Sequence, residues 1–230
     1  MMTINTHCPW SGKKVTQDSI TQYKGHAVGF CNTGCKDKFV KATTLFDQCL
    51  TDNNYGLTAS YCRYADYNQW VNKKLYQVIS QLTEEQYNQD LGAFFGSINA
   101  TLNHILIWDI NWLQRFSNHS THFQSLEYIL SFDKSSLNKT IVYEKLADLS
   151  LVRTKVDQTF MAFCHEINQA DCDSVLTYRS QSGKKFNKSF AGLIQHVFNH
   201  QTHHRGQITT LLSQMGVDPG VTDLLATLEN

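Results

Sequence analysis

The chain has 230 residues, of which 41% are hydrophobic and 17% charged, and its 20 basic residues balance its 20 acidic ones. This composition is typical of globular proteins and allows one large domain, or a large one and a small one. It excludes a basic or acidic block that would indicate nucleic acid or an anionic membrane as a partner. The apolar clusters are too short to cross a bilayer and no secretory signal is visible, so we expect a cytoplasmic protein whose cysteines are thiols or metal ligands.

The first fifty residues predict a small ββα unit that a bound metal stabilises. Residues 20–30 are typical of a hairpin, and the helix that follows carries apolar side chains on one face. Cys8, Cys31 and Cys35 lie around this unit. A unit of this size has few large apolar groups to bury, and thiolates are ligands that zinc prefers. We therefore predict a second metal site, with zinc as the candidate ion, on these three cysteines.

This N-terminal stretch resembles the YHS/TRASH-type metal-binding domains. The residues that match are Cys8, Pro9, Gly12, Tyr23, Gly25, Phe30, Cys31, Cys35 and Phe39. Ser11 stands where those domains have the second cysteine of their opening pair, which leaves three thiols rather than four. His7, His26 or Cys49 could supply the fourth ligand, and the sequence does not choose between them. Three buried free cysteines in a metal-free unit are the alternative.

A polar, turn-rich segment at residues 51–56 divides the chain. We place a Cys module at residues 1–52 and a helical domain at residues 58–230. The helical domain is predicted to contain four long helices, at residues 60–82, 97–117, 142–168 and 193–215. A long polar segment joins the second helix to the third, and a hairpin around Gly183 precedes the last. The prediction is a mainly α fold: a four-helix bundle with a long second-to-third helix crossover and a small hairpin before the last helix.

The first of these helices carries polar and aromatic residues in or beside its apolar stripe. Asn68 and Asn72 lie within the stripe and need hydrogen-bond partners if they are buried. They are either structural amides that bond across helices or support for a functional site. Tyr67 and Trp70 either line a pocket or pack in the core.

The last long helix contains four of the chain's 10 histidines. At about 100° per residue, His200 and His204 fall in the middle of its aliphatic stripe. Imidazoles one turn apart can bind one cation, whereas two buried ones without a ligand would lack partners. The alternative is a pair of core histidines bonded to carbonyls or carboxylates. His203 lies on the flank of the stripe, and Arg205 falls outside it, so we expect Arg205 on the helix surface or at an interface.

The helical domain resembles the DinB family, which belongs to a superfamily that also contains bacillithiol transferases and the mycothiol-dependent maleylpyruvate isomerase. The matching segments are residues 67–72, 102–106, 200–207 and 218–220. The resemblance implies that a metal is bound by His104, His200 and His204, although the helical pattern alone places His104 on a different flank from the apolar stripe of its helix. It also implies a four-helix bundle that pairs as a homodimer.

Three neutral imidazoles leave a cation its full charge and an open position, where bound water or thiol loses its proton more easily. Zinc or nickel is the expected metal, with iron or manganese as alternatives. The resulting hypothesis is a metal-dependent thiol S-transferase or hydrolase that acts on a small-molecule electrophile, with a low-molecular-weight thiol as cosubstrate in the first case. Asn68, Trp70, Asn72 and His203 would surround the site. The alternatives are a non-catalytic stress protein that senses or carries a metal through its Cys module, and a purely structural bundle.

Overall fold

The computed structural model describes residues 3–51, 56–133, 135–180 and 182–228. The chain divides into two compact units, residues 1–56 and 57–230. Most of the predicted linker at residues 51–56 lies outside the described residues, as does the side chain of Cys49. None of the described helices combines the length and the apolar character that crossing a membrane requires.

The N-terminal unit is a hairpin followed by a helix. Strands β1 (Ile20–Tyr23) and β2 (His26–Gly29) pair antiparallel, and α1 (Thr33–Thr51) follows them. The two turn residues, Lys24 and Gly25, both have positive φ, at 47° and 81°. That conformation suits the right-handed twist of a two-residue hairpin. The small core contains Cys8, Val28 and Phe30, against which Tyr23 and Phe39 pack.

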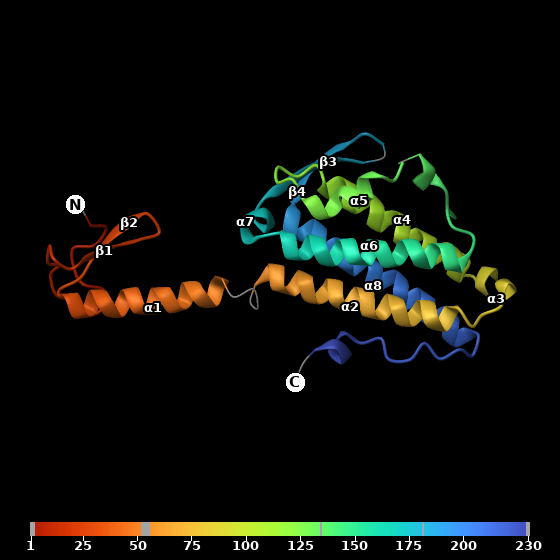
Figure 1. Ribbon diagram of the computed structural model, residues 1–230, viewed down its shortest axis with the longest axis horizontal. Coiled ribbons are helices and arrows are strands. Elements are labelled where there is room, and N and C mark those ends of the chain that lie inside the picture. Colours follow the sequence, from red (N-terminus) through yellow and green to blue (C-terminus); the bar gives the residue numbers. More distant parts are fainter. Residues whose placement is uncertain (1–2, 52–55, 134, 181, 229–230) are drawn as a thin grey trace. The chain divides into compact units, whose positions relative to one another are not determined.

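The second unit is the predicted four-helix bundle. Its long helices are α2 (Leu57–Ile79), α4 (Ile98–Phe116), α6 (Leu146–Glu166) and α8 (Phe190–Gln214). α2 packs against α6 and α8, and α4 packs against the same two helices (Figure 1). The α2–α6 side of the bundle therefore lies opposite the α4–α8 side.

The connections confirm the predicted topology. Helix α3 (Glu84–Asn88) begins with a capping box on Thr83, and the Ser97 side chain caps α4. The α4-to-α6 crossover contains η1 (Gln124–Leu126), α5 (Glu127–Leu130) and η2 (Ser136–Asn138). After α6 come α7 (Gln169–Cys172), the antiparallel strands β3 (Val175–Arg179) and β4 (Lys185–Ser189), α8, and finally η3 (Leu224–Thr227).

A buried polar network crosses the apolar core of the bundle. Arg153 on α6 pairs with Asp109 on α4, and also with Asp157 at 2.8 Å between Nη2 and Oδ1. Asp157 accepts hydrogen bonds from Asn72 at 3.1 Å and from Asn68 at 3.4 Å. The two amides expected in the α2 stripe therefore bond across helices to a buried carboxylate.

The network also includes α8. Gln201 donates to Asp109 at 2.8 Å, and Arg205 donates to Asn68. The expectation that Arg205 lies on the surface was wrong, because this residue is only 4% exposed. A guanidinium can be buried when its donors have partners and its flat face meets an aromatic ring. Here Asn68 and Thr202 accept hydrogen bonds from the Arg205 guanidinium. The guanidinium carbon, Cζ, lies 5.4 Å from the centre of the Tyr67 ring.

Candidate metal centres

Three imidazoles converge where α4 and α8 pack side by side. Nε2 of His200 lies 3.2 Å from Nε2 of His104 and 3.1 Å from Nε2 of His204. One nitrogen from each ring lies within 4.8 Å of the other two. Three nitrogens bound to one tetrahedral zinc, at about 2.0–2.1 Å each, would be about 3.3 Å apart. The structure therefore brings His104 to the other two rings at the spacing that a shared cation requires.

Gln207 determines which nitrogen of His204 carries the proton. Its Oε1 lies 2.8 Å from Nδ1 of His204. A carboxamide oxygen only accepts, so Nδ1 of His204 donates and Nε2 presents its lone pair to the other two rings. Partners of this kind commonly orient metal-binding histidines. Gln207 was not singled out as a functional residue, although its position three residues after His204 places it on a neighbouring part of the helix.

The three rings cannot satisfy one another by hydrogen bonds alone. Nε2 of His200 faces two nitrogens but carries at most one proton, so one of its two contacts lacks a hydrogen bond. Its Nδ1 is buried and has no hydrogen-bond partner among the described residues. A cation at the centre would accept all three Nε2 lone pairs. The donor set therefore fits a divalent metal better than it fits a metal-free histidine cluster.

Burial keeps these imidazoles neutral. Desolvation, with a smaller contribution from the neighbouring His204, lowers the pKa of His104 to about 4. Desolvation and the other histidines lower the pKa of His200 to about 3. The pKa of His204 is also lowered by desolvation, against the opposing hydrogen bond with Gln207. Near neutral pH the rings therefore hold lone pairs available for a metal rather than protons.

Aromatic side chains and a small cavity adjoin His104. Phe95 stacks on the His104 ring with 4.0 Å between ring centres, and its centre is 5.4 Å from that of His204. The Trp108 ring is centred 6.1 Å from that of His104. A cavity of about 240 Å³ lies beside these groups, and its wall is completed by Ile107, Asn111, Leu137, Asn138, Lys139 and Thr140. Phe95 lies in a connection between helices, where no periodic pattern indicated a role.

The residues expected to surround the triad lie in different places. His203 is exposed, and its ring centre is 4.8 Å from that of His204. Asn68 bonds to Arg205, the residue after His204, whereas Asn72 bonds to Asp157. Trp70 packs against Tyr67 and Lys74 on its own helix, with 6.2 Å between its ring centre and that of Tyr67 and 4.6 Å to the ammonium of Lys74.

The second candidate centre is the thiol cluster of the N-terminal unit. Sulfur atoms of Cys8, Cys31 and Cys35 lie within 4.8 Å of one another, and those of Cys31 and Cys35 are 3.9 Å apart. Ser11 stands where the resembling domains have the second cysteine of their opening pair, and its hydroxyl lies 3.0 Å from the Cys31 sulfur. Among the described side chains, the cluster consists of these three thiols and does not include His7 or His26.

The thiols differ in acidity. Burial raises the pKa of Cys8, but hydrogen bonds from the Ser11 side chain and from nearby backbone amides outweigh it and lower this pKa to about 6. Burial and the neighbouring thiols raise the pKa of Cys35. One thiolate is therefore available near neutral pH, and a bound cation would stabilise the deprotonated form of the others.

The comparisons with known proteins concern the bundle. A model of the DinB family matches residues 51–230. Protein DinB of Bacillus subtilis (strain 168) is 28% identical over 158 residues, which cover 69% of this chain and 87% of that protein. The family match leaves out most of the N-terminal unit, whose resemblance to YHS/TRASH-type domains stays a prediction. Since the match covers most of the chain, this protein belongs to the DinB family.

Proposed function

We propose that this protein is a metal-dependent enzyme that binds a divalent cation, zinc or nickel, through His104, His200 and His204. The observation that supports it is the convergence of three neutral Nε2 atoms at 3.1–3.2 Å, with Gln207 orienting one of them. The cation would supply a positive charge that lowers the pKa of a bound thiol or water and so makes it nucleophilic near neutral pH.

The surrounding residues favour a thiol over water as the nucleophile. None of the described residues that line the cavity beside His104 is a carboxylate that could take a proton from water. A thiol, with an ordinary pKa of about 8.5, needs less help to ionise. Phe95 stacks on the His104 ring, Trp108 lies near it, and the adjoining cavity has room for a small electrophile. A thiol S-transferase is therefore the reaction we propose, with hydrolysis as the alternative.

Metal analysis of the full-length protein tests the site. We expect the His200→Ala variant to hold about one metal ion per chain fewer than the wild type, and to lose thiol conjugation to an electrophile such as monochlorobimane. His196→Ala is the matched control, because His196 is an exposed histidine of the same helix that lies outside the cluster of three. Equal metal content in the wild type and His200→Ala would refute the proposal.

The thiol cluster supports a second candidate function, a non-catalytic protein that senses or carries a soft metal ion. The supporting observation is the low pKa of Cys8 within a cluster of three sulfur atoms. Zinc titration against a chromophoric chelator should show, besides binding at the histidines, a binding event that Cys31→Ser removes and Cys62→Ser keeps, since Cys62 belongs to the bundle. If Cys31→Ser binds as much zinc as the wild type, this candidate fails.

A further inference from the structure

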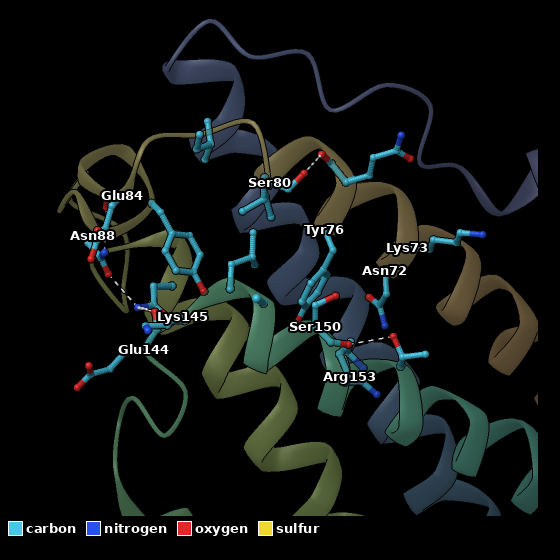
Figure 2. A pocket seen from close by; sticks show the side chains of 18 of the residues that line it. Asn72, Lys73, Tyr76, Ser80, Glu84, Asn88, Glu144, Lys145, Ser150 and Arg153 are labelled. Carbon is cyan, nitrogen blue, oxygen red and sulfur yellow. Dashed lines mark hydrogen bonds between the residues drawn. The ribbon is translucent and has the colours of Figure 1, made fainter.

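A second and larger cavity lies on the side of the bundle opposite the three imidazoles. It has a volume of about 1310 Å³ and lies between α2 and α6, with α3 and the start of α4 closing one end (Figure 2). The histidine cluster belongs to α4 and α8. This cavity therefore serves neither metal centre described above, although small-molecule sites are commonly concave regions of about this size or smaller.

Two buried phenols line this cavity without a hydrogen-bond partner. Tyr76 on α2 is 7% exposed and Tyr87 on α3 is 5% exposed. Neither hydroxyl has a hydrogen-bond partner among the residues that the structure describes. Figure 2 shows the Tyr76 ring extending from α2 toward Ser150 and Arg153 of α6. Buried hydroxyls nearly always have partners in native proteins, so these two are available to bond to a molecule in the cavity.

Both hydroxyls can donate a hydrogen bond to such a ligand under ordinary conditions. Burial raises the pKa of both Tyr76 and Tyr87 well above the ordinary value. Each phenol therefore keeps its proton across the physiological range. A carbonyl or another acceptor oxygen would satisfy these donors.

The charges around the cavity cancel. Arg153 in its floor pairs with Asp109 and Asp157, and the same network contains Arg205, so two carboxylates face two guanidinium groups. At the exposed rim, Lys73 and Lys145 are balanced by Glu84 and Glu144. A charged ligand would enter a site with no surplus charge to pair with it, and desolvation would oppose its binding.

The walls between floor and rim are apolar. They include Ile79, which is buried, together with the half-buried Leu82 and Leu146. These walls would take the hydrocarbon part of a ligand and remove it from water. We propose that the α2–α6 cavity binds an uncharged, mainly apolar small molecule whose carbonyl or ether oxygen accepts hydrogen bonds from Tyr76 and Tyr87.

The test uses the fluorophore 6-propionyl-2-(dimethylamino)naphthalene, an uncharged ketone whose emission reports burial and hydrogen bonding. Titrated into the full-length protein in the presence of a metal chelator, it should bind with saturable, blue-shifted emission. 2-Acetylnaphthalene should displace it better than 2-ethylnaphthalene, which lacks the acceptor, and better than 2-naphthoate, which is charged.

Matched variants locate the binding site. Tyr76→Phe and Tyr87→Phe remove only hydroxyls that have no protein partner, so each should fold and bind about five- to tenfold more weakly. Tyr128→Phe, a half-buried tyrosine outside this cavity, should bind as the wild type does. Ser150→Trp should fill the space and abolish saturable binding. Its folding is checked by thermal unfolding, and the two Phe variants decide the matter if it fails to fold.

Three results would overturn the proposal. The first is no saturable binding by the wild type up to the solubility limit of the fluorophore. The second is unchanged affinity in the Tyr76→Phe/Tyr87→Phe double variant. The third is stronger displacement by 2-naphthoate than by 2-acetylnaphthalene, which would indicate a site for anions.

Discussion

The α4–α8 side and the α2–α6 side of the bundle both present polar groups beside a cavity, but these groups differ in kind. On the first side, three imidazoles meet at about the spacing of metal ligands, beside a cavity of about 240 Å³. On the second side, neutral phenols and a balanced ionic network line a cavity of about 1310 Å³. The larger cavity is therefore not the one beside the three imidazoles. Residue chemistry, rather than volume, indicates where a reaction can occur.

The ionic network that joins the two sides should give the largest stability effect. Arg153→Met leaves Asp109 and Asp157 buried without their cation. Breaking a buried pair in this way costs about 3–5 kcal/mol. Urea unfolding of the metal-free protein measures the loss. Arg63→Met, which changes an exposed arginine of α2, should stay within about 0.5 kcal/mol of the wild type. Equal stability of both variants would show that the network does not hold the two sides together.

Metal affinity on the α4–α8 side should depend on Gln207, which orients the His204 ring. Gln207→Ala removes the acceptor that fixes the His204 ring. Losing such a partner typically weakens metal affinity about 10- to 100-fold. Gln207→Glu keeps an acceptor and should keep the affinity. Competition with a chelator of known affinity measures both, and Gln195→Ala, at an exposed position of α8, serves as the control. An unchanged metal affinity in Gln207→Ala would show that Gln207 does not orient His204 for metal binding.

Acid should affect the two sides differently in the metal-free protein. Desolvation lowers the pKa of His104 to about 4 and of His200 to about 3, from an ordinary 6.5. Between those values and 6.5 the unfolded chain binds more protons than the folded chain, so the free energy of unfolding falls as the pH decreases. Burial raises the pKa of Asp109 to about 6 and also raises the pKa of Asp157 on α6, and both carboxyls oppose this trend in part of the same range. The phenols of the other side do not ionise there.

A double variant isolates the histidine contribution to this pH dependence. His104→Asn/His200→Asn keeps Asp109, so the difference between the double variant and the wild type reports the two imidazoles. Urea midpoints at pH about 7 and about 5, with chelator present, should fall less in the double variant than in the wild type. A fall of the same size in both proteins would contradict the buried, neutral state of these rings.

Removing a phenol hydroxyl on the α2–α6 side should have the smallest effect on stability. Tyr76→Phe removes a hydroxyl without a described partner, so thermal and urea unfolding should be unchanged or slightly improved. Tyr61→Phe, on the same helix, removes a hydroxyl that donates to the Ala191 carbonyl at 2.9 Å and should cost about 1 kcal/mol. If Tyr76→Phe costs as much as Tyr61→Phe, the Tyr76 hydroxyl has a partner in the folded protein.

The sequence carried enough information for the fold because the fold rests on local periodicity and turn residues. The four long helices, the crossover and the hairpin around Gly183 followed from apolar stripes and from the polar and turn-forming segments between them. The pairing of His200 with His204 also follows from helical spacing alone. Predicting His104 as the third member of the cluster needed the family resemblance, because its contact with the α8 histidines depends on how two helices pack.

Other features of the site had no periodic signal. Phe95 comes from a connection, and its contact with His104 depends on the path of that connection in space. The burial of Arg205 was missed because a charged residue outside an apolar stripe is normally solvated, and its partner Asn68 lies 137 residues away. The α2–α6 cavity is a gap between helices, and no sequence pattern records where side chains fail to fill space.

The position of Gln201 and Arg205 on α8 has a consequence for how quickly a metal would be taken up. Each immediately follows a histidine of the triad, and both bond into the buried network on the adjacent face of the helix. α8 can neither roll about its axis nor slide by a residue without breaking these bonds. The metal-free bundle would already hold the three imidazoles close together, so uptake of a metal would not have to wait for the protein to fold around it.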